Sequence, residues 1–178
     1  MRAFYEQGGR FKPPIEDLPV PREGFIDTAW KAMELAQEEA LAANRPVIRA
    51  EDVLIGLLLA TDQDGPAWQI FTNQGVDVDK LIASLRKQLA LTRSPTPSFT
   101  ILGEDAVASV EHANALREAD DLTKIYPLHL LTALTAPRRT GIQRLTLEYF
   151  GANPELIHQT AMSQLREARR LAVKRTTF

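Results

Sequence analysis

The sequence predicts an all-α fold built from two pseudo-symmetric copies of a four-helix repeat. Two observations support this prediction. Apolar residues recur at three- and four-residue spacing along most of the chain, and the order of helices in the first half returns in the second half. With 178 residues, 44% of them hydrophobic, the chain is long enough to bury a core without metal or disulfide. We therefore expect eight helices that pack as one domain, preceded by an extended proline-rich arm.

The first 24 residues differ in composition from the rest. Four prolines and three glycines lie among them without helical periodicity. Proline removes a backbone donor and disfavours helix at the residue before it. We expect residues 1–24 to form an extended arm, which Phe4, Tyr5, Phe11 and Ile15 could still dock on the body.

The first repeat is expected over residues 25–91. An amphipathic pattern predicts a helix near 27–43, and a denser apolar run predicts a more buried one near 50–61. A short third helix stops at Gly75, and Asp77 is suited to cap a fourth because its carboxylate can accept a first-turn amide.

The second repeat is expected over residues 99–173, after a linker of turn-forming residues at 92–98. Its second helix mirrors that of the first repeat at an offset of 77 residues, and its third at an offset of 76. A last helix starts at Pro154 and runs to about residue 173, because proline suits a first helical turn. Residues 174–178 then form a tail.

These segments resemble the double repeat that forms the N-terminal domain of the Clp-family AAA+ unfoldases. The resemblance covers residues 25–173. It is carried best by Leu-Ala-Gln-Glu-Glu-Ala at 35–40 and by Ala-Glu-Asp-Val-Leu-Ile-Gly-Leu-Leu at 50–58, which is similar to the family's threonine-glutamate-histidine-leucine-leucine-leucine segment. In the second repeat Phe99 stands for the opening aromatic residue, and residues 129–131 for that segment. The resemblance implies a domain that docks adaptors and substrates.

The chain departs from a Clp unfoldase in a way that bears on function. It contains no G-x-x-x-x-G-K-[ST] loop to cradle phosphates. We therefore expect a stand-alone accessory or adaptor-like factor, similar in layout to accessory subunits of chloroplast Clp proteases. Its expected partners are a Clp ATPase or peptidase ring, adaptors or client proteins.

Glu51 is the first candidate binding residue. In some members of the family a glutamate in each repeat reads phosphorylated arginine, and Glu51 matches that position in the first repeat. Leu128 occupies it in the second, and Ala50 replaces the usual threonine. The resemblance thus implies a phosphoarginine or client site at Glu51, and a sensor of phosphoarginine or another small ligand is our alternative function. In the structural alternative, Glu51 and Asp52 simply favour the helix dipole, by about 0.3–1 kcal/mol.

Basic residues near the C-terminus are the second candidate. Only Glu167 opposes them, and they are Arg166, Arg169, Arg170, Lys174 and Arg175. We expect Arg166, Arg169 and Arg170 either to favour the negative end of a helix or to dock an acidic protein surface. Nucleic acid is the weaker partner, because no aromatic residue interleaves with these cations except Phe178.

No catalytic residue, metal site or cofactor is expected. The chain has no cysteine, and its three histidines fall in different predicted helices without metal-ligand spacing. No Ser-His-Asp order and no G-x-S-x-G turn indicates a nucleophile. A small hydrolase with scattered acids is the weaker alternative to a non-enzymatic interaction module.

Charge and hydropathy suggest the compartment. The chain holds 21 basic and 23 acidic residues, which disfavours nucleic-acid binding through overall charge. No apolar run approaches about 18 residues, and the N-terminus has no apolar signal core. We expect a cytoplasmic protein, with the plastid stroma as the alternative.

Overall fold

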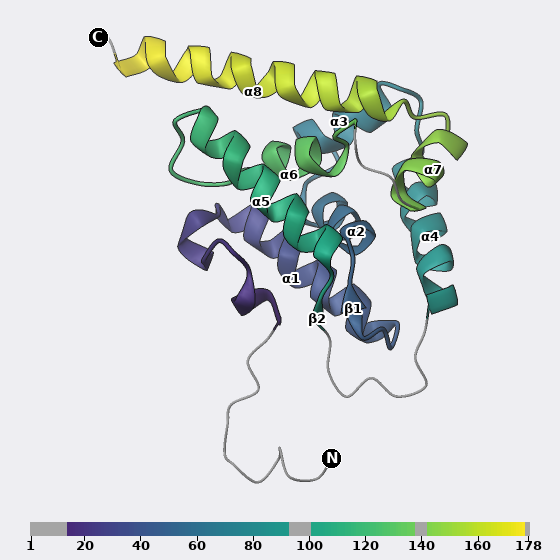
Figure 1. Ribbon diagram of the computed structural model, residues 1–178. Coiled ribbons are helices and arrows are strands. Elements are labelled where there is room, and N and C mark those ends of the chain that lie inside the picture. Colours follow the sequence, from purple (N-terminus) through teal and green to yellow (C-terminus); the bar gives the residue numbers. More distant parts are fainter. Residues whose placement is uncertain (1–13, 93–100, 138–141, 177–178) are drawn as a thin grey trace, which may run out of the picture.

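The computed structural model describes residues 14–92, 101–137 and 142–176 (Figure 1). Within them the α-helices are α1 (Asp27–Ala42), α2 (Ala50–Ala60), α3 (Pro66–Thr72), α4 (Val78–Leu89), α5 (Glu104–Ala119), α6 (Pro127–Leu134), α7 (Ile142–Tyr149) and α8 (Pro154–Thr176). The shorter elements are the 3-10 turns η1 (Pro14–Asp17), η2 (Arg22–Gly24) and η3 (Ala90–Thr92) and the strands β1 (Val47–Ile48) and β2 (Ile101–Leu102). The prediction of an all-α fold is confirmed.

The two repeats pair with each other through the segments that precede their helices. Ile48, before α2, pairs in parallel with Leu102, before α5. Phe25, before α1, forms a parallel bridge with Ile125, before α6. At an offset of 77 residues, Leu102 is the counterpart of Phe25, and Ile125 is the counterpart of Ile48. The two pairings are therefore equivalent contacts, each formed between one repeat and the other. The predicted pseudo-symmetry is therefore present. The counterpart of Phe25 is Leu102, whereas Phe99 lies outside the described residues.

Left-handed backbone positions repeat with the same symmetry. Asn44 and Asp121 follow α1 and α5 with φ of 52° and 56°. Gly75 and Gly151 follow α3 and α7 with φ of 75° and 76°. Asparagine, aspartate and glycine are the residues that tolerate this region best. The chain thus reverses at matching points in both repeats.

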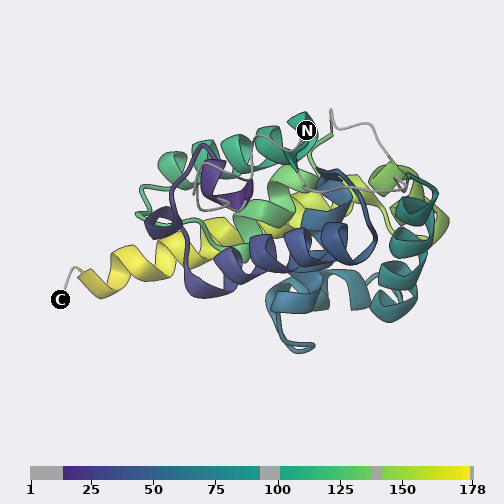
Figure 2. The same cartoon turned by 90° about the horizontal axis from the view of Figure 1, so that it is seen from below.

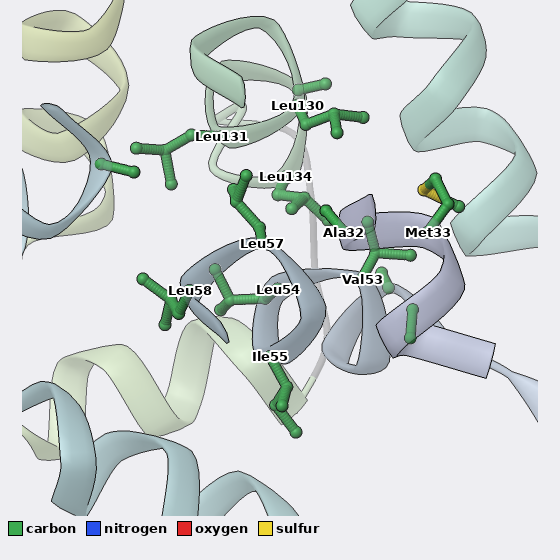
Figure 3. Close-up of a cluster of buried hydrophobic side chains, with 14 of the residues drawn as sticks. Ala32, Met33, Val53, Leu54, Ile55, Leu57, Leu58, Leu130, Leu131 and Leu134 are labelled. Carbon is green, nitrogen blue, oxygen red and sulfur yellow. The ribbon is translucent and has the colours of Figure 1, made fainter. Parts of the chain in front are cut away.

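Helix α2 lies at the centre of the domain. Its residues from Ala50 to Leu58 are all buried. Figure 3 shows Leu54 and Leu57 of α2 facing Leu131 and Leu134 of α6 in the hydrophobic core. A Cβ atom at Gly56 would lie 2.1 Å from the carbonyl oxygen of Ala32 on α1. Because glycine has no side chain, α1 and α2 can pack this closely.

Residues 14–24 pack against the body, which differs from the extended arm expected for 1–24. Ile15, Leu18 and Val20 are buried and join the hydrophobic core. Burial of these three apolar side chains offsets the conformational entropy lost when the segment is ordered. Residues 1–13 lie outside the described residues, as does the expected linker from residue 93 onward.

Helix α8 packs along only part of its length. The helix contacts α3, α6 and α7, and its buried residues Ile157, Ala161 and Leu165 lie in its first half. Its second half first runs beside the end of α5, where Arg169 contacts Ala119, and only its C-terminal end reaches past the rest of the domain (Figures 1 and 2). The helix continues to Thr176, so residues 174–176 of the expected tail are helical.

Candidate functional site

Glu51 lies in the first turn of α2, at a buried position. Only 4% of its surface is exposed. The amide of the preceding residue, Ala50, donates to Oδ2 of Asp105 at 3.2 Å. Asp105 belongs to α5, so an acid of the second repeat accepts the first amide of the helix that carries Glu51. A guanidinium at the protein surface would therefore reach Glu51 only after a local opening.

Asp52 forms a buried ion pair with Arg45. Arg45 Nη1 donates to Asp52 Oδ2 at 2.6 Å, and Nη2 donates to Oδ1. Asp52 Oδ2 also accepts the amide of Arg49 at 2.9 Å and so satisfies a free amide at the start of α2. Burial raises the pKa of the Asp52 carboxyl, and its hydrogen bonds to the Arg45 guanidinium and the Arg49 amide oppose that shift. Sequence reasoning missed this pair, although Asp52 stands where the resembling family segment has histidine.

His129 occupies the corresponding position in α6. Its Nδ1 accepts the amide of Tyr126 at 2.9 Å, and its Nε2 lies 3.5 Å from Oδ2 of Asp120. The neutral tautomer with hydrogen on Nε2 fits both contacts. Burial lowers the pKa of the His129 imidazole, and the Asp120 carboxylate opposes part of the shift.

Arg166, Arg169 and Arg170 lie on the second half of α8, where every residue from 166 to 171 is exposed. Arg169 Nη1 donates to the carbonyl oxygen of Ala119 at 3.1 Å and lies 3.9 Å from Oδ1 of Asp120. Within the described residues, Arg166 and Arg170 form no ion pair. The structure thus separates Glu51, in the core, from the basic residues. The side chains of Lys174 and Arg175 lie outside the described part.

A surface hollow of about 500 Å³ runs along α8, and its lining comprises Ser163, Arg166, Glu167, Arg170 and Leu171. Among the described residues the lining comes from one helix, whereas ligand sites enclose their ligand with groups from several elements. Among the residues that the structure describes, no three histidine, aspartate or glutamate side chains gather as metal ligands. None of the described helices combines the length and apolar composition needed to cross a bilayer.

Comparison with known sequences identifies the family. The profile of the Clp repeat (R) N-terminal domain matches residues 24–145. The chain belongs to this family. It is 32% identical over 126 residues to chaperone protein ClpB 1 of Parasynechococcus marenigrum, and 30% identical over 131 residues to chaperone protein ClpB 2 of Thermosynechococcus vestitus. The alignments cover 70% and 71% of this chain but only 14% of each relative.

Solved structures of Clp and Hsp104 N-terminal domains share the fold. The N-terminal domain of the caseinolytic protease associated chaperone ClpD from Arabidopsis thaliana gives a TM-score of 0.64 at 21% identity, covering 80% of this chain and 98% of that one. The Hsp104 N-terminal domain from Candida albicans gives 0.67 at 17% identity, covering 79% and 90%. The Clp N-terminal fold is therefore present in this chain.

Proposed function

We propose that this chain is a protein-docking module of a Clp ATPase or protease system and has no catalytic activity of its own. The observation that carries the proposal is its membership of the Clp N-terminal domain family, over residues 24–145. Relatives of this region are named as chaperones, and one structural neighbour as a chaperone associated with caseinolytic protease. The family resemblance implies that adaptors and substrates dock on such domains.

The buried polar residues support docking over catalysis. Asp52 and His129 each accept a backbone amide at the start of a helix. Arg45 forms an ion pair with Asp52. The carboxylate of Asp120 lies near both His129 and Arg169. These groups hold helix ends and join elements, which is a structural use of polar chemistry.

An accessory role is the form of docking that we favour. The 178 residues contain no phosphate-binding loop, so an ATPase outside them would supply the energy for unfolding. The chain could deliver clients, compete with the N-terminal domain of an unfoldase for adaptors, or bind the ATPase or peptidase ring. We place it in the compartment that holds such a system, either the cytoplasm or the plastid stroma.

Affinity capture from native lysate tests the proposal. The tagged chain and the tag alone are used as bait, and bound proteins are quantified by mass spectrometry. We expect a Clp ATPase or peptidase subunit to be enriched on the tagged chain. The captured subunit is then purified and titrated with the chain. Absence of every Clp component from the captured set, or no binding of the purified subunit, would contradict the proposal.

A further inference from the structure

Helix α8 extends beyond the core that the repeat symmetry defines. Its counterpart in the first repeat is α4, which ends at Leu89, a buried residue. At the offset of 76 residues that relates Val78 to Pro154, Leu89 corresponds to Leu165, which is also buried. Helix α8 nevertheless continues to Thr176. Residues 166–176, here named the α8 extension, are therefore an addition to the repeat.

The α8 extension has little packing of its own. All of its residues from 166 to 171 are exposed, and its C-terminal end reaches past the domain (Figures 1 and 2). Arg169 tethers the extension to the end of α5 through Ala119 and Asp120. This contact fixes the position of the extension beside α5, while its other side chains from 166 to 171 remain exposed to solvent.

Arg166 and Arg170 are not explained by the helix dipole. They lie ten and six positions before Thr176, whereas the dipole effect falls off within the last turn. At four-residue spacing they share one face of the helix, where like charges are destabilising. Within the described residues no carboxylate pairs with either of them. Two exposed cations on one helix face, without a described ion pair, present a positive surface to a partner.

We propose that the α8 extension is a docking site for an acidic segment of a protein partner. Arg166 and Arg170 would each form charge-assisted hydrogen bonds with a carboxylate of that segment. Leu171, which is 54% exposed, would contact its apolar side chains. An acidic amphipathic segment therefore matches both the charge and the exposed leucine.

Nucleic acid fits this surface less well than an acidic protein segment. Residues 166–171 include no aromatic side chain on which a base could stack. An acidic protein segment needs no such stacking, because carboxylates and an apolar side chain match the arginines and Leu171.

The test uses the full chain in three forms: unchanged, Arg166→Glu/Arg170→Glu, and the control Lys87→Glu/Lys124→Glu. The control makes the same change in net charge at two exposed lysines outside the α8 extension. Circular dichroism and thermal melting verify that all three forms fold equally. Three labelled probes are used. The first is an amphipathic helical peptide with Glu on one face and Leu on the other, and the second is the same peptide with Lys in place of Glu. The third is a short DNA duplex.

We expect the unchanged chain and the control to bind the acidic peptide, and the Arg166→Glu/Arg170→Glu form to lose at least about tenfold in affinity. Binding should weaken as salt is raised. Equal affinity of all three forms for the acidic peptide, no binding of it by any form, or tighter binding of the duplex would overturn the inference.

The same three forms serve as bait in lysate, because the identity of the partner rests on the proposed function. Loss of a Clp subunit from the Arg166→Glu/Arg170→Glu form alone supports both proposals. Equal recovery of that subunit on all three forms overturns the inference and leaves the proposed function standing. If no form recovers a Clp subunit, the proposed function fails, and the peptide titration still decides the inference.

Discussion

Asp52 and His129 occupy equivalent positions in the two repeats and hold their helices with opposite chemistry. Each is the third residue of its helix and accepts an amide from the residue three positions earlier, at 2.9 Å in both cases. The buried partner of Asp52 is the cation Arg45, whereas His129 faces the anion Asp120. The position caps a helix in both repeats, but Asp52 is the anion of an ion pair, whereas His129 is a neutral imidazole whose Nε2 hydrogen faces an anion.

We predict that acid weakens the fold through His129. Burial lowers the pKa of His129 below its ordinary value of 6.5. The carboxylate of Asp120 raises this pKa in part, and the nearby charge of Arg117 lowers it slightly. The unfolded chain therefore binds more protons, so this contribution to stability is complete above pH 6.5 and is lost as pH falls from 6.5 toward the folded-state pKa. Protonation of Nδ1 would also remove the acceptor for the Tyr126 amide.

Denaturant unfolding between about pH 8 and pH 5 measures this effect. The variant His129→Gln keeps an acceptor but cannot titrate. Its unfolding free energy is expected to fall less steeply with acid than that of the unchanged chain. Identical slopes in the two proteins would show that other groups cause the acid sensitivity.

We predict that loss of Arg45 is severe and that a second substitution relieves it. Arg45→Met leaves the buried Asp52 carboxylate without its guanidinium, which is expected to cost about 3–5 kcal/mol. Adding Asp52→Asn removes the charge and keeps an acceptor for the Arg49 amide, so most of that loss should be recovered. A double-mutant cycle by chemical denaturation checks both values. An additive double variant would contradict the pairing.

We predict that the segment before α1 contributes to the core. Leu18→Ala is expected to lower the unfolding free energy by about 2–3 kcal/mol, because the side chain is buried against the domain. Leu91→Ala is the matched control, since Leu91 is 87% exposed, and its effect should stay within about 0.5 kcal/mol. Thermal and denaturant unfolding give both numbers. Equal effects of the two substitutions would mean that residues 14–24 do not pack as described.

We predict that phosphoarginine gives no measurable heat in calorimetry at about millimolar concentration. Glu51 is only 4% exposed, and the corresponding position in the second repeat is the apolar Leu128. A bidentate contact needs a carboxylate that the guanidinium can reach. Heat that disappears in Glu51→Gln, while the melting temperature of that variant is unchanged, would instead establish the phosphoarginine site.

The helices were predictable because apolar spacing in the sequence directly reflects which face is buried. The contacts between repeats were not, since pairing of Ile48 with Leu102 joins two short segments that carry no periodic signal. Docking of residues 14–24 was left open for a related reason. Their prolines suggest an extended chain, while burial of Ile15 and Leu18 depends on a surface formed elsewhere.

The candidate sites were predictable to different degrees. Clustering of charge in the sequence suggested Arg166, Arg169 and Arg170 as docking residues, and that role stays a prediction. The sequence did not reveal that the packed core ends at Leu165, because that boundary follows from comparing α8 with α4 in three dimensions. Burial of Glu51 was also unexpected, since an acid in a first helical turn is usually exposed to solvent.

The reciprocal pairing of the repeats has a consequence for folding. Each repeat supplies half of both inter-repeat pairings, so neither four-helix unit can complete its own set of backbone hydrogen bonds. Unfolding should therefore proceed in one cooperative transition. If the chain were cut between Thr92 and Ile101, each fragment alone should be poorly ordered. The two fragments should regain helical structure when they are mixed.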